Sequence, residues 1–393
     1  MRFIGDIPVW GDPQENAVLQ MQNCAGEAEG CALMADHHLG YAVPIGGVVA
    51  YEGRVSPSGV GFDIACGNKA VRLDCDYGDI RKQIPSIMDE IWKSLSFGVG
   101  RVNREPVDHD LFDDDPAWKI PVAKRLKPVA RKQLGTIGGG NHYVDLFSDE
   151  RERIWAGVHF GSRGLGHKLA THFIKAGGGK NGMHVDPVLL DVETELGAEY
   201  VASMKLAGRY AYAGRDWVCE KVASILGAEI LEEVHNHHNF AWEEEHGGRH
   251  LWVVRKGATP AFPGQKGFVG GSMGDRSVIL EGVDADESEQ ALYSTVHGAG
   301  RVMSRTRAAG KTRFRKGKRI RISAGEISRD MMLAWVRGMG VELRGAGTDE
   351  SPHCYKRLPE VLEAHRGTIR ILHTLDPIGV AMAAAGEFDP YRD

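Results

Sequence analysis

The chain lacks paired cysteines. Its six cysteines are scattered along the sequence without a CxxC pair, at Cys24, Cys31, Cys66, Cys75, Cys219 and Cys354. A zinc ribbon needs such closely spaced thiols, and a small secreted domain needs a framework of disulfides. The sequence therefore argues against both classes, and we expect any cysteine with a function to act alone.

Long apolar runs and an excess of positive charge are also missing. No apolar segment approaches the roughly 20 residues that span a bilayer. The N-terminal MRFIGDIPVWG lacks the basic start and apolar core of a signal peptide, so we expect a cytoplasmic protein without membrane contact. The net charge of -5 gives no global signal for nucleic-acid binding, and a polyanionic substrate would need a local basic patch.

Internal repeats and low-complexity linkers are absent, whereas glycine is abundant, with 51 residues. Apolar residues alternate with glycine-rich turns through 40–75, 137–160 and 250–282, which predicts strands joined by functional loops. Apolar spacing predicts helices over 198–230 and 327–337. Candidate ligands fall on both sides of every plausible domain break. We therefore predict an α+β fold in which residues 1–393 form a single large domain with central β-sheets flanked by helices.

Five potential metal ligands lie beside glycine, asparagine or arginine: Asp63, Cys66, His142, His159 and His235. Each alone is more often a satisfied core residue. Together they are too many for one open tetrahedral site, so they predict a two-ion site with one shared ligand. The ligand types favour zinc at least as much as manganese. His37, His38, His237 and His238 could also be ligands but have no adjacent glycine, and we expect His237 and His238 to lie behind the ligands or at the surface.

Two glycine-rich loops have the composition of phosphate sites. The segment VHGAGR at 296–301 places His297 before glycines whose amides can approach a phosphate, with an arginine that matches phosphate oxygens. His297 is therefore a candidate covalent nucleophile, although a turn histidine bonded to backbone would look the same. The segment VGGSMGDRS at 269–277 adds the hydroxyls of Ser272 and Ser277.

A basic segment at 305–321 contains nine lysines and arginines with one phenylalanine among them. This composition suits contact with a nucleic-acid backbone. A run of charge is also typical of a solvated face. The segment predicts an RNA contact only in combination with the other motifs.

In this order along the chain, the motifs resemble the RtcB family of RNA-splicing ligases. The resemblance extends from GYAVPIGG at 40–47 to HTL at 373–375. It includes PIGGVVAYEGRVSPSGVGFDIACG, GGGNHYVDL, VHFGSRGLG, YAYAGRDWV, VHNHHN, RKGATPAFPG, GGSMGDRS, VHGAGRVMSR and TDESPHCYK. Members of this family join RNA ends that carry a 3′-phosphate or 2′,3′-cyclic phosphate to a 5′-hydroxyl.

The resemblance implies a GTP-dependent and manganese-dependent ligase. Cys66 would bridge two Mn²⁺ ions, with His142 and His159 on one and Asp63 and His235 on the other. His297 would take GMP from GTP. The implied partners are RNA and an archease-like or repair-factor helper. The implied nucleotide site comprises Asn141, His142, Tyr143, Val144, Asp145, His235, Asn236, Gly270, Gly271, Ser272, Met273, Ser277, His297, Gly298, Ala299, Gly300, Arg301 and Tyr355.

Two departures from the family pattern suggest a divergent paralogue. Asp145 stands where the family has a glutamate, and the tail at 376–393 lacks the usual lysine that contacts guanine, since no lysine follows Lys356. We therefore expect weaker guanine selectivity. The alternatives are a dinuclear metallophosphoesterase, a capping enzyme that stops after guanylylating a nucleic-acid 3′-phosphate, and a binding module with a decayed site. The complete ligand set disfavours the last.

Overall fold

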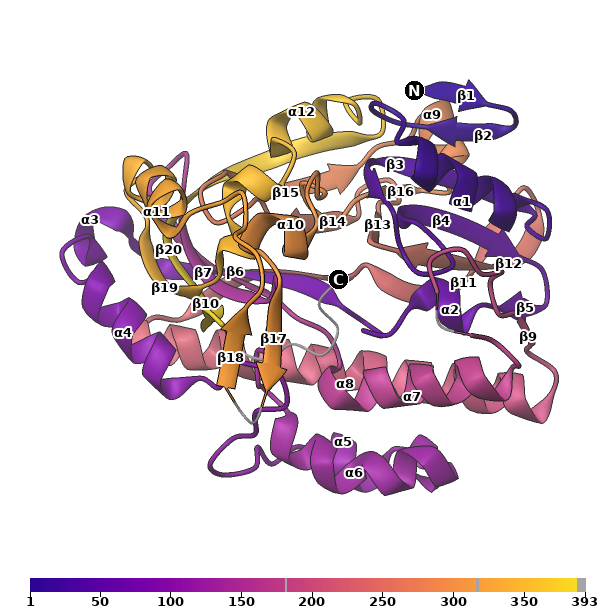
Figure 1. Cartoon of the computed structure of the whole chain (residues 1–393), viewed down its shortest axis with the longest axis horizontal. Helices are drawn as coiled ribbons and strands as arrows, with labels where there is room; N and C mark the ends of the chain where they lie inside the picture. Colours follow the sequence, from indigo (N-terminus) through magenta and orange to yellow (C-terminus); the bar gives the residue numbers. More distant parts are fainter. Residues whose placement is uncertain (181, 316–317, 387–393) are drawn as a thin grey trace.

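The computed structural model describes residues 1–180, 182–315 and 318–386, and two large sheets dominate it (Figure 1). The larger sheet is antiparallel along most of its width, and β19 pairs in parallel with β20. In spatial order it contains β10 (Ile230–His237), β6 (Gly67–Asp76), β8 (Arg153–His159), β7 (Tyr143–Asp149), β20 (Ile369–Ala384), β15 (Ser277–Gly282) and β14 (Lys266–Val269), with β19 (Glu342–Ala346) beside β20.

The second large sheet has six strands. Its order is β1 (Arg2–Ile4), β2 (Ile7–Val9), β3 (Gly30–His38), β4 (Ile45–Tyr51), β12 (Arg249–Lys256) and β11 (Asn239–His246). Three short pairs complete the strands: β13 (Ala258–Pro260) with β16 (Ser294–Val296), β17 (Thr312–Arg315) with β18 (Lys318–Arg321), and β5 (Arg54–Val55) with β9 (Leu190–Asp191). Because β10 ends at His237 and β11 begins at Asn239, one residue, His238, links the two large sheets.

Helices cover these sheets, and the prediction of an α+β fold is confirmed. The α-helices are α1 (Glu15–Ala25), α2 (Pro57–Val60), α3 (Tyr77–Ile80), α4 (Ile84–Ser94), α5 (Leu111–Asp114), α6 (Pro121–Gln133), α7 (Arg163–Ala176), α8 (Glu195–Leu226), α9 (Asp286–Gln290), α10 (Arg305–Ala309), α11 (Arg329–Gly338) and α12 (Leu358–Glu363). The 3₁₀ turns are η1 (Pro116–Lys119), η2 (Thr348–Glu350) and η3 (Pro352–Cys354). Within the described ranges, no helix combines the length and apolar character that a membrane crossing requires.

The longest helix, α8, runs beneath both sheets in Figure 1 and forms where the apolar spacing predicts it. The Thr194 hydroxyl accepts from the Gly197 amide at its start, and Gly227 ends it in the left-handed conformation that glycine tolerates. Buried residues at helical spacing, such as Tyr200, Met204 and Ala207, make one continuous face. This face and the buried faces of the sheets share the apolar cores.

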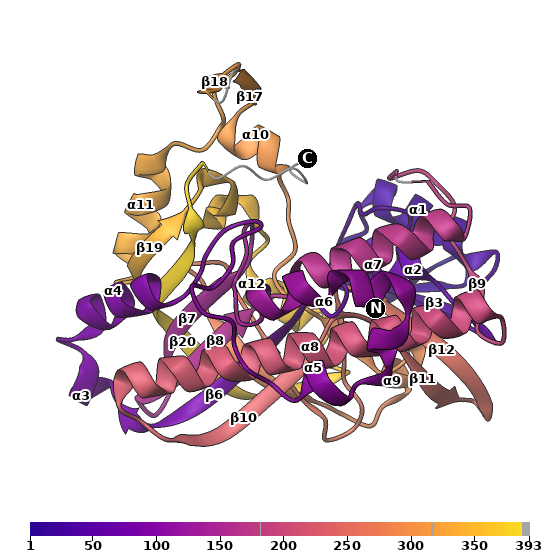
Figure 2. The same cartoon turned by 90° about the horizontal axis from the view of Figure 1, so that it is seen from below.

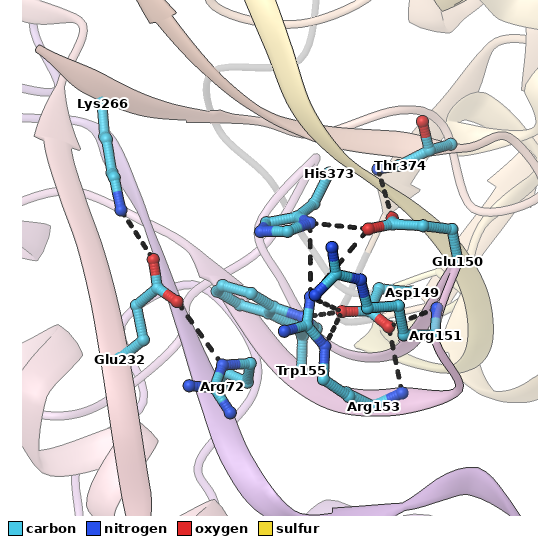
Figure 3. A network of polar contacts seen from close by, with 10 residues as sticks. All are labelled: Arg72, Asp149, Glu150, Arg151, Arg153, Trp155, Glu232, Lys266, His373 and Thr374. Carbon is cyan, nitrogen blue, oxygen red and sulfur yellow. Dashed lines mark hydrogen bonds and ion pairs between the residues drawn. The ribbon is translucent and has the colours of Figure 1, made fainter. Parts of the chain in front are cut away.

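Side chains join the two edges of the larger sheet. The backbone of Phe268 on β14 is bonded by two asparagines: its amide donates to Asn236 Oδ1 at 3.0 Å, and its carbonyl accepts from Asn68 Nδ2 at 2.9 Å. An ion pair of 2.8 Å between Lys266 and Glu232 lies beside them (Figure 3). The amide side chains thus take the place of a strand ladder, and the sheet curls so that β14 meets β10 and β6.

A polar network fixes the turn between β7 and β8 against β20 (Figure 3). The buried Asp149 accepts from the Arg151 and Arg153 amides and from Trp155 Nε1. Glu150 accepts from the Thr374 amide at 3.2 Å and lies 2.7 Å from His373 Nδ1. These acidic groups are already paired within the protein, so the network stabilises the sheet.

The basic segment and the tail take different positions. The antiparallel strands β17 and β18, with α10, project from the rest of the fold (Figure 2). Lys316 and Gly317 lie outside the described residues. The tail is ordered through β20, which ends at Ala384 inside the larger sheet, and residues 387–393 lie outside the described residues.

Candidate metal and nucleotide site

The antiparallel register brings the predicted ligands to one end of the larger sheet. Cys66 directly precedes β6, and His159 ends β8, where it pairs with Asn68 of β6 and with Tyr143 of β7. His142 directly precedes β7. Because neighbouring antiparallel strands run in opposite directions, the start of one lies beside the end of the next. Segments far apart in sequence therefore meet around Cys66.

Two groups of ligand atoms share the Cys66 sulfur. In the first group, Cys66 Sγ lies 3.6 Å from His142 Nε2, and that nitrogen lies 3.1 Å from Asp63 Oδ2. In the second, Cys66 Sγ lies 3.4 Å from His159 Nε2, and His238 completes the group. The ligand atoms within each group lie within 4.8 Å of one another. A thiolate at the meeting point of two groups is the arrangement that a two-ion site requires.

Backbone hydrogen bonds connect the turn at residues 63–66 to His238 and Asn239, where the two large sheets meet. The Ala65 amide donates to the Asn239 carbonyl at 2.7 Å, and the His238 amide donates to the Cys66 carbonyl at 2.8 Å. These main-chain bonds hold the backbone of His238 beside that of Cys66. Asn68 Oδ1 lies 2.7 Å from His159 Nδ1, which leaves His159 Nε2 to face the sulfur.

Burial suits the imidazoles to metal binding. It lowers the pKa of His142 below its usual value, and it lowers the pKa of His159 and of His238 well below theirs. Neutral imidazole is the form that binds a metal. Burial also raises the pKa of the Cys66 thiol, so metal binding would release its proton. His238 Nδ1 is buried and has no hydrogen-bond partner among the described residues, as expected for a group whose partner is an ion.

His297 lies beside this cluster, at the end of β16 and next to His238, with their ring centres 4.9 Å apart. Its Nδ1 lies 2.7 Å from Oδ2 of Asp36, a carboxylate with no exposed side-chain area. The same oxygen accepts from the amides of His297 and Gly298. Burial raises the pKa of Asp36, but the charge and hydrogen bonds of His297 outweigh it, and the pKa is lowered overall. Asp36 therefore stays ionised and holds the proton on Nδ1, which leaves the lone pair of Nε2 free.

A pocket opens beside His297. Its lining includes the two glycine-rich loops and four residues beyond the sequence prediction, His38, Glu350, Val380 and Met382. The full lining is His38, Asn141, Tyr143, Asp145, His159, Gly270, Gly271, Ser272, Met273, His297, Gly298, Ala299, Gly300, Arg301, Glu350, Tyr355, Val380 and Met382. Gly257 borders the His297 ring with φ of +61°, and a Cβ there would lie 3.0 Å from His297 Cε1.

Comparison with known proteins identifies the family at this point. The profile described as tRNA-splicing ligase RtcB matches residues 17–122 and 115–383. The chain belongs to the RtcB family. It is 31% identical to the RNA-splicing ligase RtcB of Escherichia coli K12, over 88% of each chain. It is 32% identical to the tRNA-splicing ligase RtcB of Archaeoglobus fulgidus, over 94% of this chain and 91% of that protein. Thermococcus kodakarensis has a tRNA-splicing ligase RtcB with 29% identity over 89% of this chain.

In this RtcB-family chain, His238 lies in the cluster around Cys66, where His235 was expected. Within the described ranges, His235 belongs to neither group around Cys66. Its Nε2 accepts from Arg215 Nε at 2.8 Å, and its Nδ1 lies 3.4 Å from Asp216. Residues 235 and 238 are an odd number of positions apart, so an alternating strand cannot present both to the same side.

Several residues that were predicted to contact the nucleotide lie outside the lining of the pocket. Asn236 bonds Phe268, and Ser277 Oγ accepts from the Gly271 amide at 3.0 Å, which fixes the loop. His142, Val144 and His235 are likewise outside the lining. Arg301 lines the pocket, but its guanidinium donates to Tyr355 Oη at 2.7 Å and to Glu350 at 3.3 Å. It therefore orients the wall that carries Tyr355.

Both departures from the family pattern, Asp145 and the tail without lysine, lie in the part of the pocket wall that β7 and β20 form. Burial raises the pKa of Asp145 well above its usual value and so favours the uncharged carboxyl. Its Oδ1 and the Tyr143 hydroxyl are buried and lack hydrogen-bond partners among the described residues. In the register of β20 with β7, Val380 faces Asp145 and Met382 faces Tyr143. Apolar side chains from the tail thus lie beside the unsatisfied polar atoms.

Sequence reasoning missed Asp36, Asn68 and Glu350, and it considered His38 and His238 but set them aside. Asp36 and His38 lie in the segment MADHH at the end of β3, and its composition indicates only an ordinary strand. Nothing in that pattern indicates its partner, because Asp36 and His297 are 261 positions apart. A signal for His238 did exist, since two histidines and an asparagine follow each other at 237–239 between two strands.

Proposed function

We propose that this RtcB-family chain joins RNA ends bearing a 3′-phosphate or 2′,3′-cyclic phosphate to 5′-hydroxyl ends, through GMP attached to His297. The observation that supports it best is His297 itself. Its Nδ1 is held by a buried carboxylate, and it stands between a pocket lined by glycine loops and a cluster of metal ligands. A purely structural turn histidine would not need these three surroundings.

In the proposed reaction, His297 Nε2 attacks the α-phosphorus of GTP, an N–P bond forms, and pyrophosphate leaves. Asp36 keeps the Nδ1 proton in place and offsets the positive charge that develops on the ring. Amides of the 270–273 and 298–300 loops line the pocket where the phosphates would lie. Where the RNA ends in a 2′,3′-cyclic phosphate, water first breaks the P–O2′ bond to give a 3′-phosphate and a 2′-hydroxyl. An oxygen of the RNA 3′-phosphate then attacks the GMP phosphorus and displaces His297, which gives an activated RNA–GMP anhydride. The 5′-hydroxyl attacks that anhydride, the RNA is joined, and GMP leaves.

The residues present fit two divalent ions. Asp63, Cys66 and His142 would hold one, and Cys66, His159 and His238 the other, with Mn²⁺ proposed for both. Such ions would offset negative charge on the phosphate oxygens. As parts of the same proposal, the enzyme acts in the cytoplasm and an archease-like helper assists it.

The proposal is tested by incubating the protein with Mn²⁺ and GTP and measuring the mass of the intact protein. We expect an adduct of one GMP that is stable to base and labile to acid, as a phosphoramidate is. The His297→Ala variant should form none while keeping its fold by circular dichroism. A normal adduct in that variant would overturn the assignment of His297.

Two further outcomes separate the alternatives. A dinuclear metallophosphoesterase would release phosphate from RNA ends and form no adduct with GTP. A capping enzyme would form the adduct and transfer GMP to a 3′-phosphate, but the product would accumulate when a 5′-hydroxyl strand is present. Joined RNA in that last reaction supports the ligase.

A further inference from the structure

Three aromatic rings lie outside the nucleotide pocket and form what we call the aromatic ladder: Tyr41, Phe62 and His167. Phe62 stacks on His167 with ring centres 5.3 Å apart and 25° between the planes. Tyr41 meets Phe62 edge-on at 6.1 Å and 83°. The side chain of Tyr41 is 40% exposed. The rings come from the β3–β4 loop, the segment after α2, and α7, and α2 and α7 lie side by side (Figures 1 and 2).

The protein holds the backbone of Tyr41 firmly while its ring stays in contact with solvent. The side chain of Gln20 bonds both the amide and the carbonyl of Gly40, and the Ala42 amide donates to the Gly182 carbonyl at 3.1 Å. The buried ammonium of Lys256 donates to the carbonyls of Tyr41 and Ser58. Burial lowers the pKa of Lys256 to about 7, so this contact carries a desolvation cost. An exposed aromatic ring on a rigid loop is typical of a binding surface.

The aromatic ladder adjoins the half of the metal cluster that the nucleotide pocket does not reach. The pocket lining includes His159 and His297 but omits Asp63, Cys66 and His142. Phe62 directly precedes Asp63, and the charge of Asp63 acts on the His167 ring. Cations lie close by: Arg163 Nη1 is 3.2 Å from His142 Nδ1, and the exposed Lys168 follows His167.

We propose that the aromatic ladder stacks an unpaired base at the reacting end of the RNA. This inference rests on the proposed function. With GMP filling the pocket on one side of the cluster, an RNA end must approach from the other side. If the oxygens of the terminal nucleotide reach the Asp63 group, the base of that nucleotide lies close to Phe62, because Phe62 directly precedes Asp63. Every base has a π-face, so such stacking tolerates any sequence, and Arg163 and Lys168 supply charge for the adjoining phosphates.

The test compares Tyr41→Ala, Tyr41→Trp and the parent enzyme. We expect Tyr41→Ala to raise the KM for RNA by about 5- to 100-fold, with a much smaller change in kcat, because stacking binds the strand without touching the reacting atoms. Tyr41→Trp should restore the KM. The control is Phe3→Ala, which removes a ring that is 56% exposed on β1, and it should leave the KM unchanged.

The decisive experiment uses an RNA whose terminal nucleotide lacks its base. The parent enzyme should bind it more weakly by the same factor, and Tyr41→Ala should lose nothing further, because the two changes remove one interaction. Independent, additive losses would overturn the proposal, as would an unchanged affinity in Tyr41→Ala. RNA affinity is measured by fluorescence anisotropy without GTP. Failure of guanylylation in the parent enzyme would therefore count against the proposed function alone.

Discussion

A single buried carboxylate determines how His297 can react. Imidazole can carry its proton on either ring nitrogen, and the partner of one nitrogen decides which is free. Asp36 Oδ2 lies 2.7 Å from His297 Nδ1 and also accepts from two backbone amides. Because these bonds fix both the ring and the loop that carries it, Asp36 is a positioning residue for the proposed nucleophile.

The Asp36→Asn substitution tests this role. An amide has nearly the same shape, but it lacks the charge that stabilises the developing imidazolium, and its NH₂ group can select the wrong tautomer. We expect self-guanylylation with GTP and Mn²⁺ to slow by roughly 10- to 1000-fold. Asp6→Asn, which changes an exposed carboxylate, is the control. A rate equal to that of the parent protein would show that Asp36 only stabilises the loop.

Separate substitutions of His235 and His238 distinguish metal binding from structural hydrogen bonding. His238→Ala should reduce bound Mn²⁺ by about one ion per chain, because it removes a ligand from one group around Cys66. His235→Ala should keep both ions, since that ring bonds Arg215 and Asp216. Metal analysis after dialysis measures this. The reverse result would return the ligand assignment to His235.

The part of the pocket wall that contains Asp145 and Met382 predicts that the protein distinguishes guanine from adenine only weakly. A neutral Asp145 can both donate and accept, so it can pair with the edge of guanine or of adenine. We expect GTP to be preferred over ATP by a small margin. Met382→Lys should widen this margin by about tenfold, because a lysine opposite Tyr143 attracts the guanine carbonyl and repels the adenine amine. Met331→Lys, at an exposed position on α11, is the control. An unchanged ratio in Met382→Lys would show that other groups read the base.

At the scale of elements, most of the basic segment lies in the paired strands β17 and β18. In their register Arg313 pairs with Ile320 and Arg315 pairs with Lys318, while Arg319 and Arg321 fall on the alternate positions. Together with the projection of these strands from the body (Figure 2), this concentration of lysine and arginine favours contact with phosphates.

Neutralising the basic segment tests this interpretation. The triple change of Arg313, Arg315 and Lys316 to glutamine should weaken RNA binding and make its dependence on salt less steep by about 2 in log–log slope, because each lost phosphate contact releases fewer counterions. Self-guanylylation should be unaffected. The matched control neutralises Arg81, Lys82 and Lys93 around α3 and α4. An unchanged salt slope would make the basic segment an ordinary solvated face.

At the scale of the whole molecule, the metal cluster connects the two large sheets. Its ligands come from the starts of β6 and β7, the end of β8, and the single residue between β10 and β11. Ions that bind only the folded chain stabilise it by about 2.7 kcal/mol at one hundred times the dissociation constant. The cluster should therefore support the fold as well as the chemistry.

Removal of metal is expected to lower the melting temperature by a few degrees, and added Mn²⁺ should restore it. Cys66→Ala should abolish this response, because the shared thiolate serves both groups. Cys219→Ala, in the buried core of α8, should be less stable than the parent protein but should keep the response to metal. Differential scanning calorimetry with and without EDTA decides between these outcomes. A response that persists in Cys66→Ala would contradict the bridging role.

The sequence alone determined the α+β class, the helix at α8, the family and most residues of the cluster around Cys66, because periodicity, glycine positions and ordered motifs are local properties of the chain. Only the tertiary structure decided which residues meet. The choice of His238 over His235 depends on where β10 ends, and the pairing of Asp36 with His297 depends on a contact across 261 positions. The unpaired Asp145 and the aromatic ladder likewise follow from packing, because burial and the approach of distant segments leave no periodic trace in the sequence.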